Sequence, residues 1–585
     1  MTSAAVDPDP SGLDYFDLGR YTRPTASSSA TAQTWFDRGL VWAYAFNHEE
    51  AVTCFEQALE ADPDLALAHW GIAYAVGPNY NKGWDAFDPV DLAQSVARAR
   101  DELALAADAA LSGHATDLDG ELVAALALRF AGIDPHDPPE AASWQAGHEA
   151  YADAMVALAG RYPTDLDVLA LAADALVNVT AWALWDPLTG APAPGSRAIE
   201  AEALLDAALA LPGGSEHPGV LHLHIHLLEM SDRPEAAIPT ADLLRGLVPD
   251  AGHLQHMPSH IDVLCGDYHA AITANGLAVQ ADRRFVELKG PVNFYSLYRA
   301  HDLHFVVYAA MFLGRFGDAV AAAEELRGQL TPELLSIESP PMADWLEAFV
   351  PLRVHVLVRF GRWAELAEEP LPSDRELFCT TTAMVLYGRA LAHAALGDVE
   401  AAVAGRAELA EAVARVPETR YLFNNTARDI LGVAAAMLDG EIAYRQGLFD
   451  EAFGLLARAV ELDDALPYDE PWGWMQPTRH AYGALLLEQG RVEEAAAVYA
   501  ADLGFDPTVS RSVHHPANVW ALHGYHECLE RLGRVDEARV VAQLLAVASA
   551  RADVPVLASC ACRLEVFEVA GPSTGESACG CGCGC

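Results

Sequence analysis

The sequence predicts an all-α protein, a solenoid of antiparallel helix pairs, and three observations support this fold class. Alanine, leucine, glutamate and arginine dominate the periodic stretches, and alternating β-branched residues are scarce, a composition typical of helices. One 34-residue unit near the start has the residue spacing of a helix pair. A turn followed by a small residue then recurs along the rest of the chain.

The first unit, residues 32–65, has the residue spacing of an antiparallel helix pair. Small residues at positions 8 and 20 let the two helices approach, large residues at positions 11 and 24 fill the seam, and a proline ends the second helix. Positions 4, 8, 11, 20, 24, 27 and 32 are Trp35, Gly39, Trp42, Ala51, Phe55, Ala58 and Pro63, which is the tetratricopeptide repeat (TPR) pattern. Each such pair needs neighbours, so we expect a stack of units.

The turn and its position-20 alanine recur at irregular intervals. These alanines are Ala236, Ala271, Ala319, Ala402, Ala452, Ala495 and Ala538. Residues 66–235 match the repeat poorly but read as helical between Pro/Gly-rich breaks. We therefore predict a TPR-like α-solenoid over residues 31–565, preceded by a disordered segment (1–30) and followed by a flexible Gly/Cys-rich tail (566–585).

Composition and charge exclude several functional classes. With 52% hydrophobic residues the chain can bury a core, which excludes disorder over most of its length. The net charge of −47 disfavours nucleic acid and anionic lipid, because both need a positive protein surface. The start, MTSAAVDPDP, lacks the features of a signal peptide, and no run of residues is long and apolar enough to span a membrane. We expect a cytoplasmic protein with no nucleic-acid partner and no membrane.

Histidines gather where the repeats are expected to face a concave groove. Resemblance to known TPR domains implies that positions 2, 5, 9, 12 and 13 of each unit point into this groove. Counted from the nearest alanine, groove positions hold His253, His256, His260, His301 and His304. One unit earlier, His222 and His226 share a helix face and Glu229 holds position 13, whereas His224 points elsewhere.

Imidazoles three or four residues apart on packed helices suit first-row transition metals, and an added carboxylate with open positions suits a catalytic ion. We predict a copper, zinc or iron site from His222, His226, His253, His256, His260, His301 and His304. Glu229 and Asp302 are candidate ligands or general bases. Further groove residues are His48, Asn79, Asn81, His480 and His523. The alternative is that these histidines hydrogen-bond to their neighbours or to a peptide.

The C-terminal tail alternates cysteine with glycine. Such a segment presents soft thiolates that suit Cu(I) or Zn(II). Its candidate ligands are Cys579, Cys581, Cys583 and Cys585. Metal capture or delivery to the groove, modification by other enzymes, and no selected role all remain open.

The stretches FNHEEA followed by GPNYN, LHIHLLEM, HMPSHI and YSLYRAHDLHF resemble a bacterial family of large TPR-containing proteins, over roughly residues 30–565. The resemblance implies the solenoid fold. The family's recurrent histidines map onto His48, His226, His253, His256, His260, His301 and His304. The CGCGC end departs from the usual pattern, so any role for it is particular to this chain.

Three functions follow from these observations. The first is a metal-binding protein, with metal-dependent catalysis as its extension. The second is a scaffold that binds a peptide, protein or small-molecule ligand in the groove. The third is copper or zinc storage or delivery through the tail. Peptide-carboxylate clamps use lysine and arginine at concave positions, whereas this chain places histidine there, which favours the first function.

Overall fold

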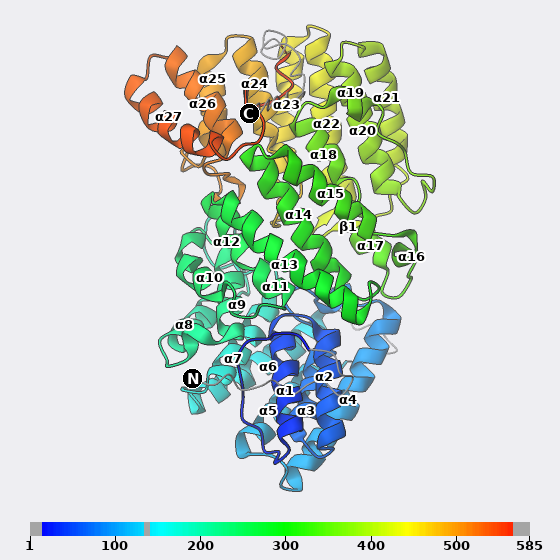
Figure 1. Cartoon of the computed structure of the whole chain (residues 1–585), viewed down its shortest axis with the longest axis vertical. Coiled ribbons are helices and arrows are strands. Elements are labelled where there is room, and N and C mark those ends of the chain that lie inside the picture. Colours follow the sequence, from blue (N-terminus) through cyan, green and yellow to red (C-terminus); the bar gives the residue numbers. More distant parts are fainter. Residues whose placement is uncertain (1–14, 134–140, 565–585) are drawn as a thin grey trace, which may run out of the picture.

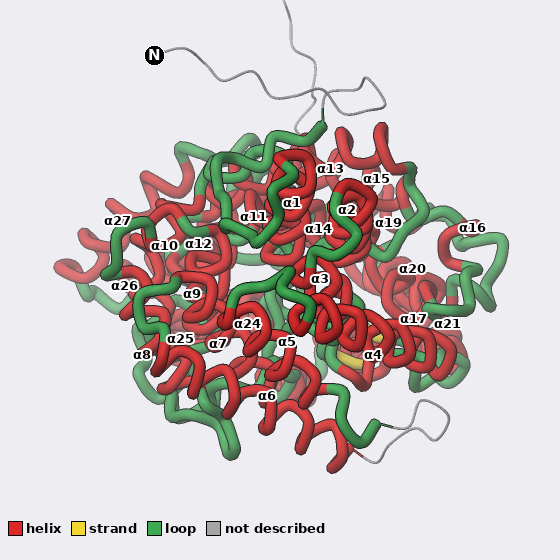
Figure 2. The backbone as a smooth tube through the Cα atoms, turned by 90° about the horizontal axis from the view of Figure 1, so that it is seen from below, coloured by secondary structure: helices red, strands yellow, loops and turns green. Residues whose placement is uncertain are grey.

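A computed structural model describes residues 15–133 and 141–564, and helices account for most of this backbone (Figures 1 and 2). The prediction of an all-α, TPR-like solenoid is confirmed. None of the described helices has the length and apolar character needed to cross a bilayer. The chain runs from α1–α7 at the bottom of Figure 1 to α24–α27 at the top, with α14 near the middle.

Most helices pack against the next helix along the chain. The helices of the first half are α1 (Ala30–Tyr44), α2 (His48–Ala61), α3 (Ala66–Ala75), α4 (Pro89–Leu111), α5 (Asp117–Arg129), α6 (Ala141–Arg161), α7 (Leu166–Val177), α8 (Ala198–Leu209), α9 (Pro218–Glu229), α10 (Ile238–Leu244), α11 (Gly252–His256), α12 (Pro258–Cys265) and α13 (Tyr268–Lys289).

The second half continues the same packing. Its helices are α14 (Ser296–Leu313), α15 (Phe316–Gln329), α16 (Pro332–Leu335), α17 (Met342–Leu346), α18 (Leu352–Arg359), α19 (Trp363–Ala367), α20 (Cys379–Ala395), α21 (Val399–Val413), α22 (Ala427–Arg445), α23 (Phe449–Asp464), α24 (Thr478–Glu488), α25 (Val492–Asp502), α26 (Val519–Arg531) and α27 (Val535–Ser549).

Short elements interrupt the helices. Strands β1 (Tyr421–Leu422) and β2 (Asn425–Thr426) pair antiparallel. Single 3₁₀ turns are η1 (Trp84–Ala86), η2 (Asn178–Thr180), η3 (Gly214–Glu216), η4 (Pro234–Ala237), η5 (Glu347–Phe349) and η6 (Arg511–Val513). In the part of the chain that the structure describes, β1 and β2 form the one sheet.

The seam of the first TPR unit depends on two glycines. A Cβ atom on Gly39 of α1 would lie 2.6 Å from the Phe55 ring, and one on Gly71 of α3 would lie 2.7 Å from it. Gly483 and Gly524 bracket Tyr499 in the same way near the C-terminus, at 2.5 and 2.4 Å. Glycine at these positions therefore lets two first helices close on one aromatic ring of the intervening second helix.

Residues 15–29, part of the N-terminal segment predicted to be disordered, pack against the solenoid. The Phe16 ring is buried, with its centroid 5.2 Å from that of Trp42. Arg23 donates to the carboxylate of Asp167 on α7 at 2.8 Å. Apolar rings and one buried ion pair thus hold a segment whose composition alone indicates disorder.

Candidate metal centre

The seven histidines predicted as metal ligands lie on four helices, namely α9, α11, α12 and α14, which Figure 1 shows near one another. Helix α9 begins at Pro218, and the side chain of His217 caps it by accepting from the Val220 N–H at 3.2 Å. His222 and His226 lie one turn apart and project to the same side. His224 points away, with its Nδ1 atom 2.9 Å from the Thr240 hydroxyl.

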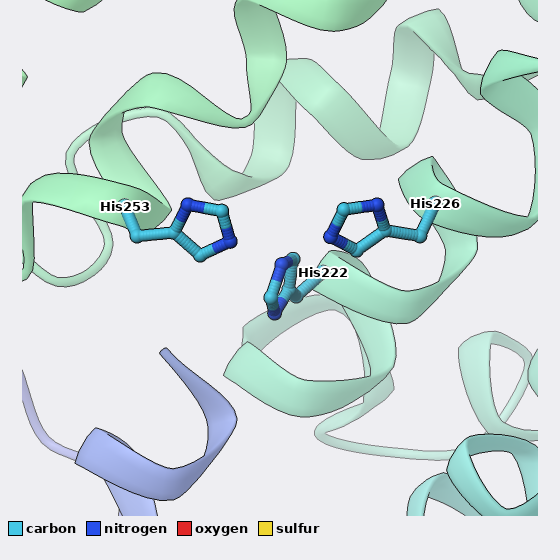
Figure 3. Close-up of side chains that lie close together, drawn as sticks. All are labelled: His222, His226 and His253. Atoms are coloured by element: carbon cyan, nitrogen blue, oxygen red, sulfur yellow. The ribbon is translucent and has the colours of Figure 1, made fainter. Parts of the chain in front are cut away.

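The first histidine set consists of His222, His226 and His253, which converge from α9 and α11 (Figure 3). One nitrogen from each ring lies within 4.8 Å of the other two. The outer Nδ1 of His222 lies 2.6 Å from the Tyr44 carbonyl, and the outer Nδ1 of His226 lies 2.9 Å from Glu229. Within the described chain, the Nε2 atoms of His222 and His226 and both nitrogens of His253 have no hydrogen-bond partner.

The second set consists of His256, His260 and His301. It lies beside the first, since the ring centroids of His253 and His256 are 5.7 Å apart. The Nε2 atoms of His256 and His260 lie 2.8 Å apart. Nδ1 of His256 lies 2.7 Å from Oδ1 of Asn275, whose amide nitrogen donates to the Ala271 carbonyl. These contacts fix the outer side of His256 and leave its inner nitrogen facing His260.

Two buried glutamates meet the second set at His260. Nδ1 of His260 lies 2.5 Å from Oε2 of Glu470 and 3.0 Å from Oε2 of Glu229. The other oxygen of Glu470 accepts from the Tyr468 hydroxyl at 2.5 Å. Glu229 also contacts His226, so one carboxylate joins the two histidine sets.

Burial sets the protonation of most of these rings. Removal from water lowers the pKa of His222, His253, His256 and His301 well below 6.5, and neighbouring imidazoles lower it further. These four rings are therefore neutral at pH 7 and can act as ligands through a free lone pair.

His260 differs from the other histidines because two neighbouring carboxylates raise its pKa. Burial alone disfavours its charged form, but Glu229 and Glu470 outweigh burial and raise its pKa to about 10. Burial also opposes the charge on Glu229, yet His226 and His260 lower its pKa to about 2. Burial raises the pKa of Glu470 to about 7. At pH 7 this part of the cluster therefore holds a positive His260 and a negative Glu229, and Glu470 has a pKa close to that pH.

Three aromatic residues with left-handed backbone conformations surround the histidines. Phe46, Trp182 and Phe423 have φ angles of 55°, 57° and 48°. Their ring centroids lie 4.5 Å from His222, 6.3 Å from His226 and 4.6 Å from His301, respectively. Bulky residues rarely adopt this conformation, and backbone strain of this kind concentrates at functional sites.

A cavity of about 620 Å³ opens on the histidine cluster. Four of the histidines form one wall: His226, His253, His260 and His301. Much of the remainder is aromatic and includes Tyr80, Trp182, Tyr298, Trp345 and Phe423. The volume, and a lining that combines aromatic rings with convergent polar groups, are typical of a small-molecule site.

Two further residues predicted for the metal site, His304 and Asp302, lie outside the two histidine sets. His304 contacts Met475 Sδ through Nε2 at 2.8 Å and belongs to none of the convergent sets. Asp302 is buried, with Oδ1 3.4 Å from Nδ1 of His256. Burial and the neighbouring Asp282 raise the pKa of Asp302 well above its ordinary value, which favours the neutral acid.

The predicted groove residues separate into three places. Asn81 lines the cavity. His48 and Asn79 line a neighbouring pocket, where Nδ1 of His48 lies 2.8 Å from the Ala75 carbonyl. His480 lies apart, 2.9 Å from Asp502, and His523 is on α26. The tail cysteines lie outside the described residues.

Sequence reasoning missed Glu470, Asn275 and the strained aromatic residues. Glu470 lies in the non-helical segment between α23 and α24, where helical periodicity assigns no face. Asn275 lies on α13, a second helix of its unit, and such helices were not expected to face the groove. The paired acids in YDEPWGW offered the one available signal for Glu470.

Comparison with known proteins agrees with the repeat architecture. The tetratricopeptide repeat profile matches residues 32–65. No curated protein matches the chain at a significant level. The fold and this match define a TPR-like α-solenoid.

Three solved structures illustrate the likeness. Ypp1 is 9% identical, with 89% of this chain and 88% of that chain covered and a TM-score of 0.42. The APC/C hetero-tetramer Cut9–Hcn1 is 11% identical, with 90% of this chain and 88% of that chain covered and a TM-score of 0.27. Yeast Tom70 is 13% identical, with 88% of this chain and 98% of that chain covered and a TM-score of 0.25.

Proposed function

We propose that this protein is a metalloprotein that holds a transition-metal ion between His222, His226 and His253, at the wall of a small-molecule cavity. The observation that carries the proposal is the convergence of buried imidazole nitrogens without partners in the described chain. Buried polar atoms almost always have a hydrogen-bond partner, so each exception needs a physical cause.

Hydrogen bonding fixes which nitrogens carry hydrogen. The Tyr44 carbonyl can only accept, so Nδ1 of His222 donates to it and Nε2 of this neutral ring is a lone pair. The Glu229 carboxylate likewise accepts a hydrogen bond from Nδ1–H of His226, so Nε2 of the neutral His226 ring is also a lone pair. A neutral His253 has one N–H and can satisfy at most one of these two lone pairs. A metal cation satisfies all three rings together.

The donor set also indicates which metals fit. Imidazole nitrogen suits zinc, copper and iron, whereas magnesium and calcium prefer all-oxygen sites. The outer contacts of His222 and His226 to Tyr44 and Glu229 are those that orient metal-binding histidines in general. Because His226 and His253 line the cavity, a small molecule can reach the ion, which suits metal-dependent catalysis. Glu229 remains the candidate for a general base, whereas Asp302, which burial and Asp282 keep as the neutral acid, does not suit that role.

The test uses the full-length chain with Cys579, Cys581, Cys583 and Cys585 replaced by serine, which removes the tail thiolates. The protein is loaded separately with Zn(II), Cu(II) and Fe(II) and dialysed, and its metal content is then measured. We expect bound metal to survive the tail substitutions and to be lost in His222→Gln/His226→Gln.

His224→Gln is the matched control, because this buried histidine lies on the same helix but faces Thr240. It is expected to keep the metal. Metal lost with the tail substitutions alone supports storage or delivery by the tail. Absence of metal from every loaded sample contradicts the proposal.

Partner binding is a second candidate function, favoured by the repeat architecture and by an open groove of about 1600 Å³. The groove lies between the N-terminal segment and α7, and its lining holds five acidic residues, Glu216 among them, against the two arginines Arg20 and Arg23. This chemistry suits an extended basic peptide. Calorimetry with a lysine-rich dodecapeptide tests this candidate. Binding that weakens in Glu216→Lys, with none for a glutamate-rich peptide, is expected; equal binding of both peptides contradicts it.

A further inference from the structure

We infer that the cavity holds two adjacent ions, the second between His256, His260 and His301. This inference rests on the proposed function, because it adds a second ion to the same histidine wall. The second set converges as closely as the first, with one nitrogen per ring within 4.8 Å of the others. All three rings are buried.

The facing nitrogens of His256 and His260 require a positive charge between them. Asn275 donates its amide hydrogen to the Ala271 carbonyl, so its oxygen must accept from Nδ1 of His256. On the other ring, Nδ1 of His260 donates to Glu470. Two neutral rings bonded in this way would place two lone pairs only 2.8 Å apart, which is repulsive. Either a proton or a metal ion must therefore bridge the pair.

The histidine sets are close enough to form one centre. Ring centroids are 5.7 Å apart for His253 and His256 and 6.0 Å apart for His226 and His260. Glu229 spans the boundary, with one oxygen 2.9 Å from His226 and the other 3.0 Å from His260. Glu229 therefore contacts one proposed ligand of each ion.

Charge also favours two ions. Glu229 and Glu470 are buried beside the histidines. In the described parts of the chain, their ion-pair partners are histidines, with no lysine or arginine among them. Buried carboxylates are normally paired with cations or coordinate metals. Two divalent ions would supply the missing positive charge without adding a side chain.

Two neighbouring ions would act together on one ligand. Paired metal sites with a separation of roughly 3.5–4 Å clamp a ligand between both ions. Here His226, His253, His260 and His301 of the two sets line the same cavity, so its contents would meet both ions. The ligand class is thus a small molecule with a donor atom, such as an oxygen, able to bridge two metals, and with an apolar body against the aromatic wall.

The experiment is a Cu(II) titration of the full-length chain carrying the four tail serines, followed by metal analysis and electron paramagnetic resonance. We expect two tightly bound ions per chain. Adjacent Cu(II) ions couple magnetically, so the spin count of the loaded protein should fall to less than half of its copper content.

Variants assign the second ion. His256→Gln/His301→Gln is expected to bind one ion with a full spin count. His304→Gln, a change at a buried histidine outside the sets, should keep two coupled ions. Circular dichroism of the metal-free variants checks their folding. If a variant does not fold, the spin count of the protein with an unmutated histidine cluster still tests the inference.

The outcomes separate this inference from the proposed function. One ion per chain, lost in His222→Gln/His226→Gln, overturns the second ion and leaves the proposed function standing. Two ions with a full spin count and no dipolar broadening of their signals also overturn the inference, because such ions are too far apart to interact. No tightly bound ion in the cluster contradicts both.

Discussion

The ring of Phe46 lies 4.5 Å from the ring of His222, although Phe46 has a φ angle of 55°. It also covers His226 and His253, at 5.6 Å from each. The residue thus keeps a rare backbone conformation in the turn between α1 and α2 while its side chain closes one side of the first histidine set. Packing against the histidines offsets the cost of that conformation.

This relationship predicts an unusual order of stability at position 46. Alanine would lose the ring and keep the left-handed strain, whereas glycine adopts this conformation freely. We expect Phe46→Gly to be more stable than Phe46→Ala by roughly 1 kcal/mol. Urea unfolding of the metal-free proteins measures the difference. A more stable alanine variant would show that strain at this position is negligible.

Asn275 is expected to position His256 for the second ion. Its carbonyl oxygen holds the Nδ1 hydrogen of His256 at 2.7 Å. Asn275→Leu removes this acceptor and should weaken binding of the second ion by about 10–100-fold, as loss of outer contacts to metal ligands typically does. Asn275→Asp keeps an acceptor and should restore most of the affinity. Co(II) titration measures both; equal losses in the two variants would indicate a packing defect instead.

Asp167 is expected to make the fold sensitive to acid. It accepts from Tyr44 at 2.7 Å and from Arg23 at 2.8 Å, and it lies 3.2 Å from His217. Burial opposes its charge, but His217 and Arg23 outweigh burial and hold its pKa below the ordinary value. Its stabilising effect is therefore full above the unfolded pKa of about 3.9 and is lost as the pH falls through the lower folded value.

Asp167→Asn should lower the free energy of unfolding at pH 7 by about 3–5 kcal/mol, because it leaves Arg23 buried without its strongest partner. It should also flatten the dependence of stability on pH below about pH 4. Denaturant unfolding between pH 3 and pH 7 measures both effects. Asp153→Asn, at an exposed ion pair with Arg197, serves as the control and should change stability by less than about 1 kcal/mol. If the free energy of unfolding of Asp167→Asn fell below pH 4 as steeply as that of the unmutated protein, the acid sensitivity would belong to other groups.

The close helix approach at Tyr499 predicts opposite effects for two glycine substitutions. A Cβ atom at Gly483 would lie 2.5 Å from the tyrosine ring, so Gly483→Ala should cost about 1–3 kcal/mol. Gly432 lies inside α22 with no atom within 4 Å of such a Cβ, so Gly432→Ala should stabilise the protein by about 0.5–1 kcal/mol. Thermal unfolding gives both values. Stabilisation by Gly483→Ala would contradict the packing described for this seam.

The sequence supports strong predictions where periodicity governs position. The unit at residues 32–65 becomes α1 and α2, with Gly39 and Phe55 in the seam as their spacing predicts. His222 and His226 share a face because they lie one helical turn apart. These relationships depend on local helix geometry, which a single sequence carries.

Long-range packing could not be read in this way. Glu470 reaches His260 from an irregular segment 210 residues later, and Phe423 reaches His301 from the turn between β1 and β2. Neither segment has a period that fixes the direction of its side chains. The Phe16 ring shows the same limit, because its burial depends on Trp42 rather than on its own acidic surroundings.

The most direct test is a crystal structure of the metal-loaded, full-length protein with anomalous data collected at the metal absorption edge. The metal centre predicts one anomalous peak within about 2.3 Å of the Nε2 atoms of both His222 and His226, and a second peak beside His256 and His260. No peak at the histidine cluster, with these rings hydrogen-bonded to ordered waters or to one another, would contradict the central claim.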